Sequence, residues 1–197
     1  MSSDYRTILK RRTIRRFKQI PIPLAILKKL VNAARLAPSA ANLQSLEYLI
    51  VDSPEVRDKL FPYLKWANYI VPRDMPPEGK RPVAYVVVLV NQKKELLAYS
   101  AYDAGAAIEN LILTAWEIGI GVCWIRALDK EKILRFLKLP KNLKLDSVLA
   151  LGYCAEMPKP EILVKSIKYW KDSRGRLHVP KRRLADIMHI NTVRFNG

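Results

Sequence analysis

The chain has few of the residues that metal and disulfide sites require. Its 197 residues include only two cysteines and two histidines. Cys123 and Cys154 are far apart and lie in apolar, strand-like contexts, so we expect buried thiols rather than a disulfide or a metal site. His178 and His189 are too few to complete a metal site. The sequence therefore predicts neither a metal cofactor nor a disulfide framework.

Long apolar runs are missing as well. No run approaches the roughly 20 apolar residues that a membrane-spanning helix needs, and residues 1–6 lack the apolar core of a signal peptide. We therefore expect a soluble, cytoplasmic protein that does not associate with membranes. The sequence also contains no internal repeat and no low-complexity linker. Because a chain of this length buries roughly 70% of its unfolded surface in one core, we expect a single domain over residues 1–197.

Acidic residues are scarce relative to basic ones. The 35 lysines and arginines outnumber the 18 aspartates and glutamates, which gives a formal charge of +17. Basic residues crowd residues 6–18 and residues 165–183, while the middle of the chain is more balanced. A basic surface attracts phosphates from any source, so nucleic-acid binding and a merely solvated basic face are both open at this point. Because one basic cluster lies near each end of the chain, we expect the fold to bring both clusters to one anionic ligand.

The N-terminal cluster contains the most informative motif, Arg11-Arg12-Thr13-Ile14-Arg15. In an extended conformation Arg11, Thr13 and Arg15 fall on one face, where forked guanidinium donors suit a phosphate. Arg16 is expected to contribute little to this binding. A second polar segment, residues 38–44, follows a predicted helix and offers amide groups suited to hydrogen bonding with a polar ring edge.

Apolar periodicity predicts alternating helices and short strands. The predicted helices cover residues 23–37, 54–64, 102–118 and 129–137, and the predicted strands cover residues 48–51, 85–90, 122–125 and 148–153. The strand at 85–90 is apolar on both faces, so we expect it at the centre of the sheet. The helix at 102–118 carries apolar side chains on several faces, which favours burial by a second subunit and therefore a homodimer. The proline-rich residues 69–81 are expected to form an irregular loop, a candidate cover for a substrate.

These motifs occur in an order that carries a family resemblance. Besides the two polar segments, the matching pieces are Asp103-Ala104-Gly105-Ala106-Ala107, Gly119-Ile120-Gly121 with Trp124, Leu151-Gly152-Tyr153 and Pro180-Lys181-Arg182-Arg183. The chain resembles the FMN-dependent nitroreductase family over nearly its whole length. The resemblance implies an α+β fold, a three-layer sandwich with a mixed, mainly antiparallel sheet between helices. It also implies an intertwined homodimer in which residues 184–197 extend onto the partner subunit.

The resemblance further assigns residues to an FMN site at the subunit interface. The phosphate and ribityl chain would be held by Arg11, Arg12, Thr13 and Arg15, and the phosphate site would be completed by Lys181, Arg182 and Arg183. The flavin would be approached from the other subunit by Pro38, Ser39, Ala40 and Asn42, with Gln44 as an additional contact. Backbone donors directed at the reactive flavin nitrogen would come from Ile125 and Arg126, although many family members have glycine where this chain has Arg126.

The chemistry implied by the resemblance belongs to the cofactor. NADH or NADPH would reduce FMN, and a small oxidised acceptor such as a nitroaromatic, a quinone or a flavin would then take the electrons in a ping-pong cycle. The sequence contains no coherent acid, base or nucleophile motif, so we expect no catalytic side chain. Two alternatives stay open. One is a flavin enzyme of the same fold with dehalogenase or dehydrogenase chemistry, and the other, from a different class, is a basic nucleic-acid-binding module.

Overall fold

A four-stranded sheet forms the centre of the computed structural model, which describes residues 2–67, 69–70, 74–94 and 99–192. Its strands are β1 (Leu46–Val51), β2 (Ala84–Asn91), β3 (Ile120–Ile125) and β4 (Leu143–Tyr153). They lie in the order β1-β2-β4-β3, and every neighbouring pair is antiparallel. Residues 84–90 of β2 are buried on both faces, so the predicted central strand is confirmed. The sequence underestimated β4, because its first residues alternate with polar ones and lack a continuous apolar run.

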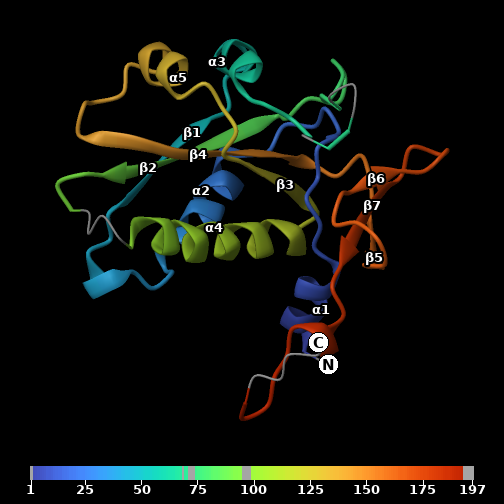
Figure 1. Ribbon diagram of the computed structural model, residues 1–197. Coiled ribbons are helices and arrows are strands. Elements are labelled where there is room, and N and C mark those ends of the chain that lie inside the picture. Colours follow the sequence, from blue (N-terminus) through green and yellow to red (C-terminus); the bar gives the residue numbers. More distant parts are fainter. Residues whose placement is uncertain (1, 68, 71–73, 95–98, 193–197) are drawn as a thin grey trace.

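Helices cover both faces of this sheet (Figure 1). On one face lie α2 (Leu24–Arg35) and α4 (Ser100–Glu117), and on the other lie α3 (Pro54–Leu60) and α5 (Lys130–Phe136). Alternate residues of β2 enter the two cores, since Val86 and Val88 pack with α2 and α4 while Val87 and Leu89 pack with the opposite layer. The expected three-layer α+β sandwich is therefore confirmed.

The predicted helix at 54–64 is shorter than expected. It divides into α3 and a 3-10 turn, η2 (Phe61–Tyr63), that carries Pro62. Proline has no N–H to continue the α-helical pattern, which explains the division. The predicted helix at 129–137 is confirmed as α5, whose first turn is capped by the Asp129 carboxylate.

The helix α4 buries one face and leaves the other open within the chain. Ala104, Ile108, Leu111 and Ala115 are buried against the sheet and α2, whereas Tyr102 is 75% exposed. Ile118, the last residue of the predicted helix at 102–118, lies at the helix end and is exposed. A short N-terminal helix, α1 (Ser3–Lys10), lies against α4, with Thr7 Oγ1 3.3 Å from Glu117 Oε1.

A second, small sheet contains the parallel pairing. It consists of β5 (Lys159–Ile162), β6 (Trp170–Lys171) and β7 (Leu177–Lys181) in the order β5-β7-β6. The β5/β7 pair is parallel and the β6/β7 pair is antiparallel. Beyond β7 comes a 3-10 turn, η3 (Leu184–Asp186), and residues 181–192 are exposed throughout. Among the described residues, no helix has the length and apolar character needed to cross a membrane.

The proline-rich region at 69–81 is irregular where it is described. Residues 69–70 and 74–81 form neither helix nor strand. Pro72, one of the prolines on which this expectation rests, lies outside the described residues.

Candidate functional site

The arginine motif lies along the free edge of the central sheet. Thr13 forms a parallel bridge with Val122 of β3, and the Ile14 N–H donates to the Val122 carbonyl at 3.2 Å. Ile14 is fully buried. It can approach this closely because a Cβ on Gly121 would lie 2.5 Å from Ile14 Cγ1. The motif is therefore anchored on β3 through Thr13 and Ile14, with the Ile14 side chain directed into the core.

The three arginines of the motif have different surroundings. Arg12 turns back onto the end of α1, where its Nη2 donates to the Leu9 carbonyl at 2.8 Å and its Nη1 to the Arg11 carbonyl. Burial, with a contribution from the neighbouring Arg11, lowers the pKa of Arg12. Arg11 Nε lies 3.3 Å from Glu109 Oε1 on α4, a partly exposed pair that contributes little to stability. The Arg15 guanidinium lies over the Tyr169 ring, 5.1 Å from its centroid.

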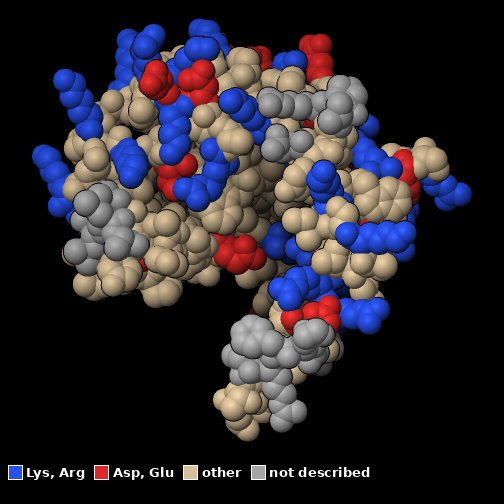
Figure 2. Space-filling model, in the orientation of Figure 1, with Lys and Arg blue, Asp and Glu red and all other residues tan. Residues whose placement is uncertain are grey.

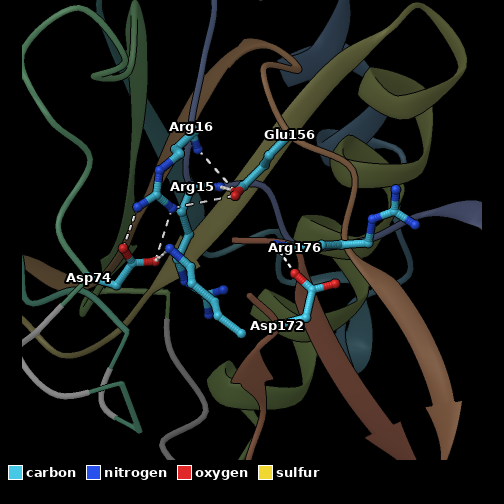
Figure 3. Close-up of polar contacts among 7 residues, drawn as sticks. Arg15, Arg16, Asp74, Glu156, Asp172 and Arg176 are labelled. Atoms are coloured by element: carbon cyan, nitrogen blue, oxygen red, sulfur yellow. Dashed lines mark hydrogen bonds and ion pairs between the residues drawn. The ribbon is translucent and has the colours of Figure 1, made fainter. Parts of the chain in front are cut away.

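Arg16, next in the chain, belongs to an ion-pair network. Its guanidinium donates to both carboxylate oxygens of Asp74, and its Nη1 is 3.5 Å from Glu156 Oε2 (Figure 3). Lys171 Nζ is 2.7 Å from Asp74 Oδ2. Burial opposes ionisation of Asp74, but its hydrogen bonds with Arg16 and Lys171 outweigh that effect and lower its pKa. The hydrogen bond with Asp74 raises the pKa of Arg16, so these charges are matched within the fold.

The second segment is shaped by a carboxylate of α4. The Ala40 N–H donates to Asp103 Oδ1 at 3.0 Å, and a 3-10 turn, η1 (Ala40–Asn42), follows. Ala41, Asn42 and Gln44 have positive φ values of 49°, 53° and 50°, an uncommon backbone state outside glycine. The Gln44 N–H donates to Ser39 Oγ at 3.2 Å. The loop is therefore tightly turned rather than extended.

A small cavity lies beneath this loop. It has a volume of about 130 Å³, and its lining includes Pro38, Ser39, Gln44, Tyr48 and Asp103. Burial raises the pKa of Tyr48 to about 12. Asn42 is exposed and does not line the cavity. Pro38, Ser39 and Gln44 are thus brought together, and Ala40 is held beside them by Asp103.

The two polar segments do not form one site within a single chain. Residues 38–44 lie beside the N-terminal end of α4, where Ala40 contacts Asp103, whereas Arg11 pairs with Glu109 near the middle of the helix (Figure 1). Among the described residues, no hydrogen bond or ion pair joins the two segments.

The remaining predicted residues lie at other edges of the fold. Ile125 ends β3 with its side chain buried, so only its backbone is available to a ligand. The Arg126 side chain is exposed, and its Nη2 is 3.6 Å from Asp146 Oδ1 on β4. Three basic residues at the end of β7 and just after it are exposed, namely Lys181, Arg182 and Arg183. Arg182 donates to the Asp186 carbonyl at 2.6 Å. Within the described part of the chain the three residues make no hydrogen bond or ion pair with the arginine motif.

The donor chemistry of the arginine motif fits a phosphate. Arg15 has no carboxylate partner among the described residues, and the buried Arg12 Nε has no hydrogen-bond acceptor there. A metal site finds no comparable support, because the described residues contain no cluster of three or more His, Cys, Asp or Glu side chains. The cysteines are free, as expected. Cys123 is buried, which raises its pKa to about 11, and Cys154 is half-buried.

Sequence reasoning missed the acidic residues that shape the site. Asp74 and Glu156 hold Arg16, and Asp103 holds the loop at residue 40. Asp103 was part of a motif, but its role was not foreseen. The small number of acidic residues is the signal that could have identified them. In so basic a chain, each acidic side chain is expected to pair with basic ones.

The layered fold and the anchored basic edge define a three-layer α+β sandwich of the nitroreductase type. The model of the Nitroreductase family matches residues 8–153. This chain belongs to the Nitroreductase family.

Individual relatives agree with that membership. A protein of Archaeoglobus fulgidus with the provisional name NADH dehydrogenase/NAD(P)H nitroreductase is 30% identical over 167 residues, which cover 82% of this chain and 88% of the relative. The structure of an FMN-dependent nitroreductase from Clostridium difficile superposes with a TM-score of 0.68 at 23% identity, covering 95% of this chain and 98% of that one. A provisionally named nitroreductase from Desulfovibrio desulfuricans, in complex with FMN, gives a TM-score of 0.72 at 19% identity, covering 98% and 99%. Both structural likenesses show the shared fold.

Proposed function

We propose that this protein is an FMN-dependent oxidoreductase that transfers electrons from NADH or NADPH to an oxidised small molecule such as a nitroaromatic, a quinone or a flavin. Family membership supports the reaction class, and the names of the relatives include NAD(P)H nitroreductase and FMN-dependent nitroreductase. The observation that carries the proposal is the arginine motif, anchored at the edge of β3 with Arg15 unpaired by any described carboxylate.

The chain's own residues bind and orient the cofactor. Arg11 and Arg15 donate to its phosphate, Thr13 lies between them on the same extended segment, and the partnerless Nε of Arg12 adds a donor. A flavin phosphate carries close to two negative charges, and several charged donors are needed to hold it in a partly dry site. The exposed segment Lys181–Arg183 supplies further positive charge.

The site is completed by a second copy of the chain. Pro38, Ser39, Ala40, Asn42 and Gln44 of one protomer approach the flavin bound to the arginine motif of the other. Their separation from the motif within one chain supports this arrangement. Residues 1–197 act as one domain, whose segment 184–197 crosses to the partner; residues 193–197 of that segment lie outside the described residues.

Bound FMN supplies the redox chemistry, accepting a hydride and later returning electrons. The nicotinamide and the acceptor occupy the same open face in turn, which makes the cycle ping-pong. The backbone at Ile125 and Arg126 would donate hydrogen bonds there, and the exposed Arg126 guanidinium would add positive charge. A positive charge at this position would stabilise negative charge on the bound cofactor.

The distribution of basic side chains argues against a dedicated nucleic-acid surface. On the face shown in Figure 2, lysines and arginines are spread over the main body and the small-sheet lobe, without forming one continuous stripe. A module that follows a phosphate backbone concentrates its charge on one face or along one helix. We therefore interpret most of the +17 charge as a solvated surface.

Anaerobic stopped-flow reduction tests the proposal. The protein is loaded with FMN, mixed with NADH or NADPH, and followed by loss of flavin absorbance, and the reduced protein is then offered nitroaromatic, quinone and flavin acceptors. We expect at least one nicotinamide to bleach the flavin and at least one acceptor to restore it. Retained FMN that neither nicotinamide reduces would leave a flavin enzyme with dehalogenase or dehydrogenase chemistry. Failure to take up FMN, combined with binding to duplex DNA at physiological salt, would refute the oxidoreductase proposal.

A further inference from the structure

Four charged side chains meet beside the arginine motif, and they come from four separate segments of the chain. Arg16 follows the motif, Asp74 precedes β2, Glu156 follows β4, and Lys171 lies in β6. Their side chains are between 12% and 23% exposed. Ion pairs this shielded from water are screened less by salt than surface pairs are. The network therefore fixes the motif relative to both sheets.

Glu156 has a more specific role than charge neutralisation. Its Oε1 accepts hydrogen bonds from the backbone N–H groups of both Arg15 and Arg16, the second at 3.1 Å, while its Oε2 faces the Arg16 guanidinium (Figure 3). Two successive N–H groups held by one carboxylate oxygen fix the orientation of the peptide between them. The direction in which the Arg15 side chain leaves the backbone is thereby fixed as well.

Because of these contacts, carboxylates neutralise one of two adjacent arginines and not the other. Arg16 is neutralised by Asp74 and Glu156, whereas Arg15 lies over Tyr169 and has no carboxylate partner in the described part of the chain. An anion at this edge therefore meets the charge of Arg15 undiminished. Tyr169 adds a second constraint, because its hydroxyl accepts from the Tyr69 N–H at 3.3 Å and its ring packs 5.1 Å from that of Tyr69.

We propose that Glu156 is a positioning residue for FMN binding, acting through the backbone of Arg15 and Arg16 to aim the Arg15 guanidinium at the cofactor phosphate. This inference rests on the proposed function, because it assumes that the ligand of Arg15 is FMN. Glu156 itself does not touch the cofactor. Arg16, Asp74 and Lys171 keep Glu156 in place and neutralise its surroundings.

The test measures FMN affinity and stability separately. Apoprotein variants Glu156→Ala and Glu156→Gln are titrated with FMN by fluorescence quenching, and their thermal unfolding is followed without FMN. We expect Glu156→Ala to raise the Kd about tenfold or more, as loss of charge-assisted hydrogen bonds predicts. Glu156→Gln retains a carbonyl acceptor and should show a smaller rise. The control is Glu55→Ala, which removes an exposed pair with Lys59 on α3 and should leave the Kd unchanged.

A double-mutant comparison separates positioning from general support. Arg15→Ala is made in the wild-type chain and in the Glu156→Ala chain. If Glu156 acts through Arg15, the two changes together raise the Kd by much less than the product of their separate effects. The inference is overturned if the two fold-changes in Kd multiply in full, or if Glu156→Ala has the wild-type Kd. In either case, FMN binding by the wild-type protein leaves the proposed function standing. If Glu156→Ala does not fold, an unchanged Kd in Glu156→Gln overturns it. A wild-type protein that binds no FMN removes the proposed function and the inference with it.

Discussion

Arg12, Arg15 and Arg16 lie within one short segment, yet their guanidiniums occupy three distinct environments. Arg12 donates to the carbonyls at the end of α1, Arg16 is paired with carboxylates, and Arg15 packs over an aromatic ring. Guanidinium groups used in this way are not interchangeable, since their neighbours decide how much charge each presents to a ligand. Among these three, Arg15 is the one best placed to bind an anion.

Removing Arg15 should therefore weaken cofactor binding directly. We expect Arg15→Ala and Arg11→Ala each to reduce the FMN binding free energy by about 1–3 kcal/mol, the range for a lost charge-assisted hydrogen bond. Fluorescence titration of the apoproteins measures the change. Lys132→Ala, which removes an exposed lysine of α5 that pairs with Asp129, serves as a charge-matched control. Unaltered affinity in both arginine variants would exclude them from the phosphate site.

The sequence could identify this motif but not the partners of its side chains. Alternation along an extended segment placed Arg15 on the same face as Arg11 and Thr13, and bridging to β3 agrees with an extended motif. The neutralising carboxylates of Arg16 were beyond such reasoning, because Asp74 is 58 residues away and Glu156 is 140 residues away. Only the folded chain brings such residues together.

His178 forms a second charge cluster, in the small sheet. Its Nδ1 is 2.9 Å from Glu161 Oε2 and its Nε2 is 3.2 Å from Asp172 Oδ2. Only a doubly protonated ring donates to both carboxylates. Hydrogen bonds to Glu161 and Asp172 raise the pKa of His178 above its ordinary value. The Trp170 ring stacks on the imidazole with 4.2 Å between centroids.

The small sheet should consequently weaken as the pH rises. A raised folded-state pKa contributes stability that is complete below the unfolded value of about 6.5 and is lost as the pH passes through the folded value. The carboxylates act in the opposite direction, since hydrogen bonds to Trp170 and His178 lower the pKa of Glu161, and this contribution disappears in acid. We expect the thermal advantage of wild type over His178→Gln to shrink as the pH rises above the unfolded pKa of about 6.5. NMR titration should give His178 a pKa above the ordinary value of about 6.5, and a value at or below it would contradict the prediction.

The helices and strands with a clear apolar pattern could be predicted from the sequence, whereas the more polar helices and strands could not. Both-face burial identified β2, and helical spacing identified α2 and α4. The helix α1 has no buried residue, and β6 is only two residues long. The apolar pattern of α1 is short, with Tyr5, Ile8 and Leu9 at helical spacing and all exposed, and β6 is too brief to show one. Isolated propensity does not reveal elements of that kind.

Close packing between the arginine motif and the sheet edge depends on glycine. A Cβ at Gly121 would meet Ile14 at 2.5 Å and Cys154 Sγ at 2.9 Å. We expect Gly121→Ala to lower the free energy of unfolding by about 1–3 kcal/mol, as overpacking of a tight core does. Urea unfolding measures it. Gly79→Ala, where a Cβ meets nothing within 4 Å, should change stability by less than about 0.5 kcal/mol; equal effects at both positions would contradict the argument.

The whole molecule leaves apolar side chains uncovered beyond the small sheet. Leu184, Ile187, Met188 and Ile190 are each at least half exposed. Exposed apolar segments of this size are characteristic of surfaces covered by a partner. The family resemblance is the basis for expecting the C-terminal segment to cross to the partner subunit. No pattern in the sequence of one chain indicates where that segment would bind.

Deleting residues 184–197 should therefore shift the protein from dimer to monomer. The deletion removes the exposed apolar side chains proposed to cover the partner, so we also expect FMN affinity to fall. Light scattering coupled to size-exclusion chromatography measures the mass, and FMN titration follows in the same buffer. Deletion of residues 193–197 alone is the control and should preserve the dimer. A deletion of 184–197 that stays dimeric and binds FMN normally would rule out this role.

The burial of β2 also has a consequence during synthesis. The strand is an uncharged, β-branched run that can pair along either edge, the kind of segment that associates with copies of itself when uncovered. Its neighbour β1 is made before it, but β4 begins about 50 residues later, a delay of roughly 3–10 s at ordinary rates of translation. During that interval one edge of the most aggregation-prone strand has no partner. The nascent chain is thus most in need of a chaperone while α4 and β3 are still being made.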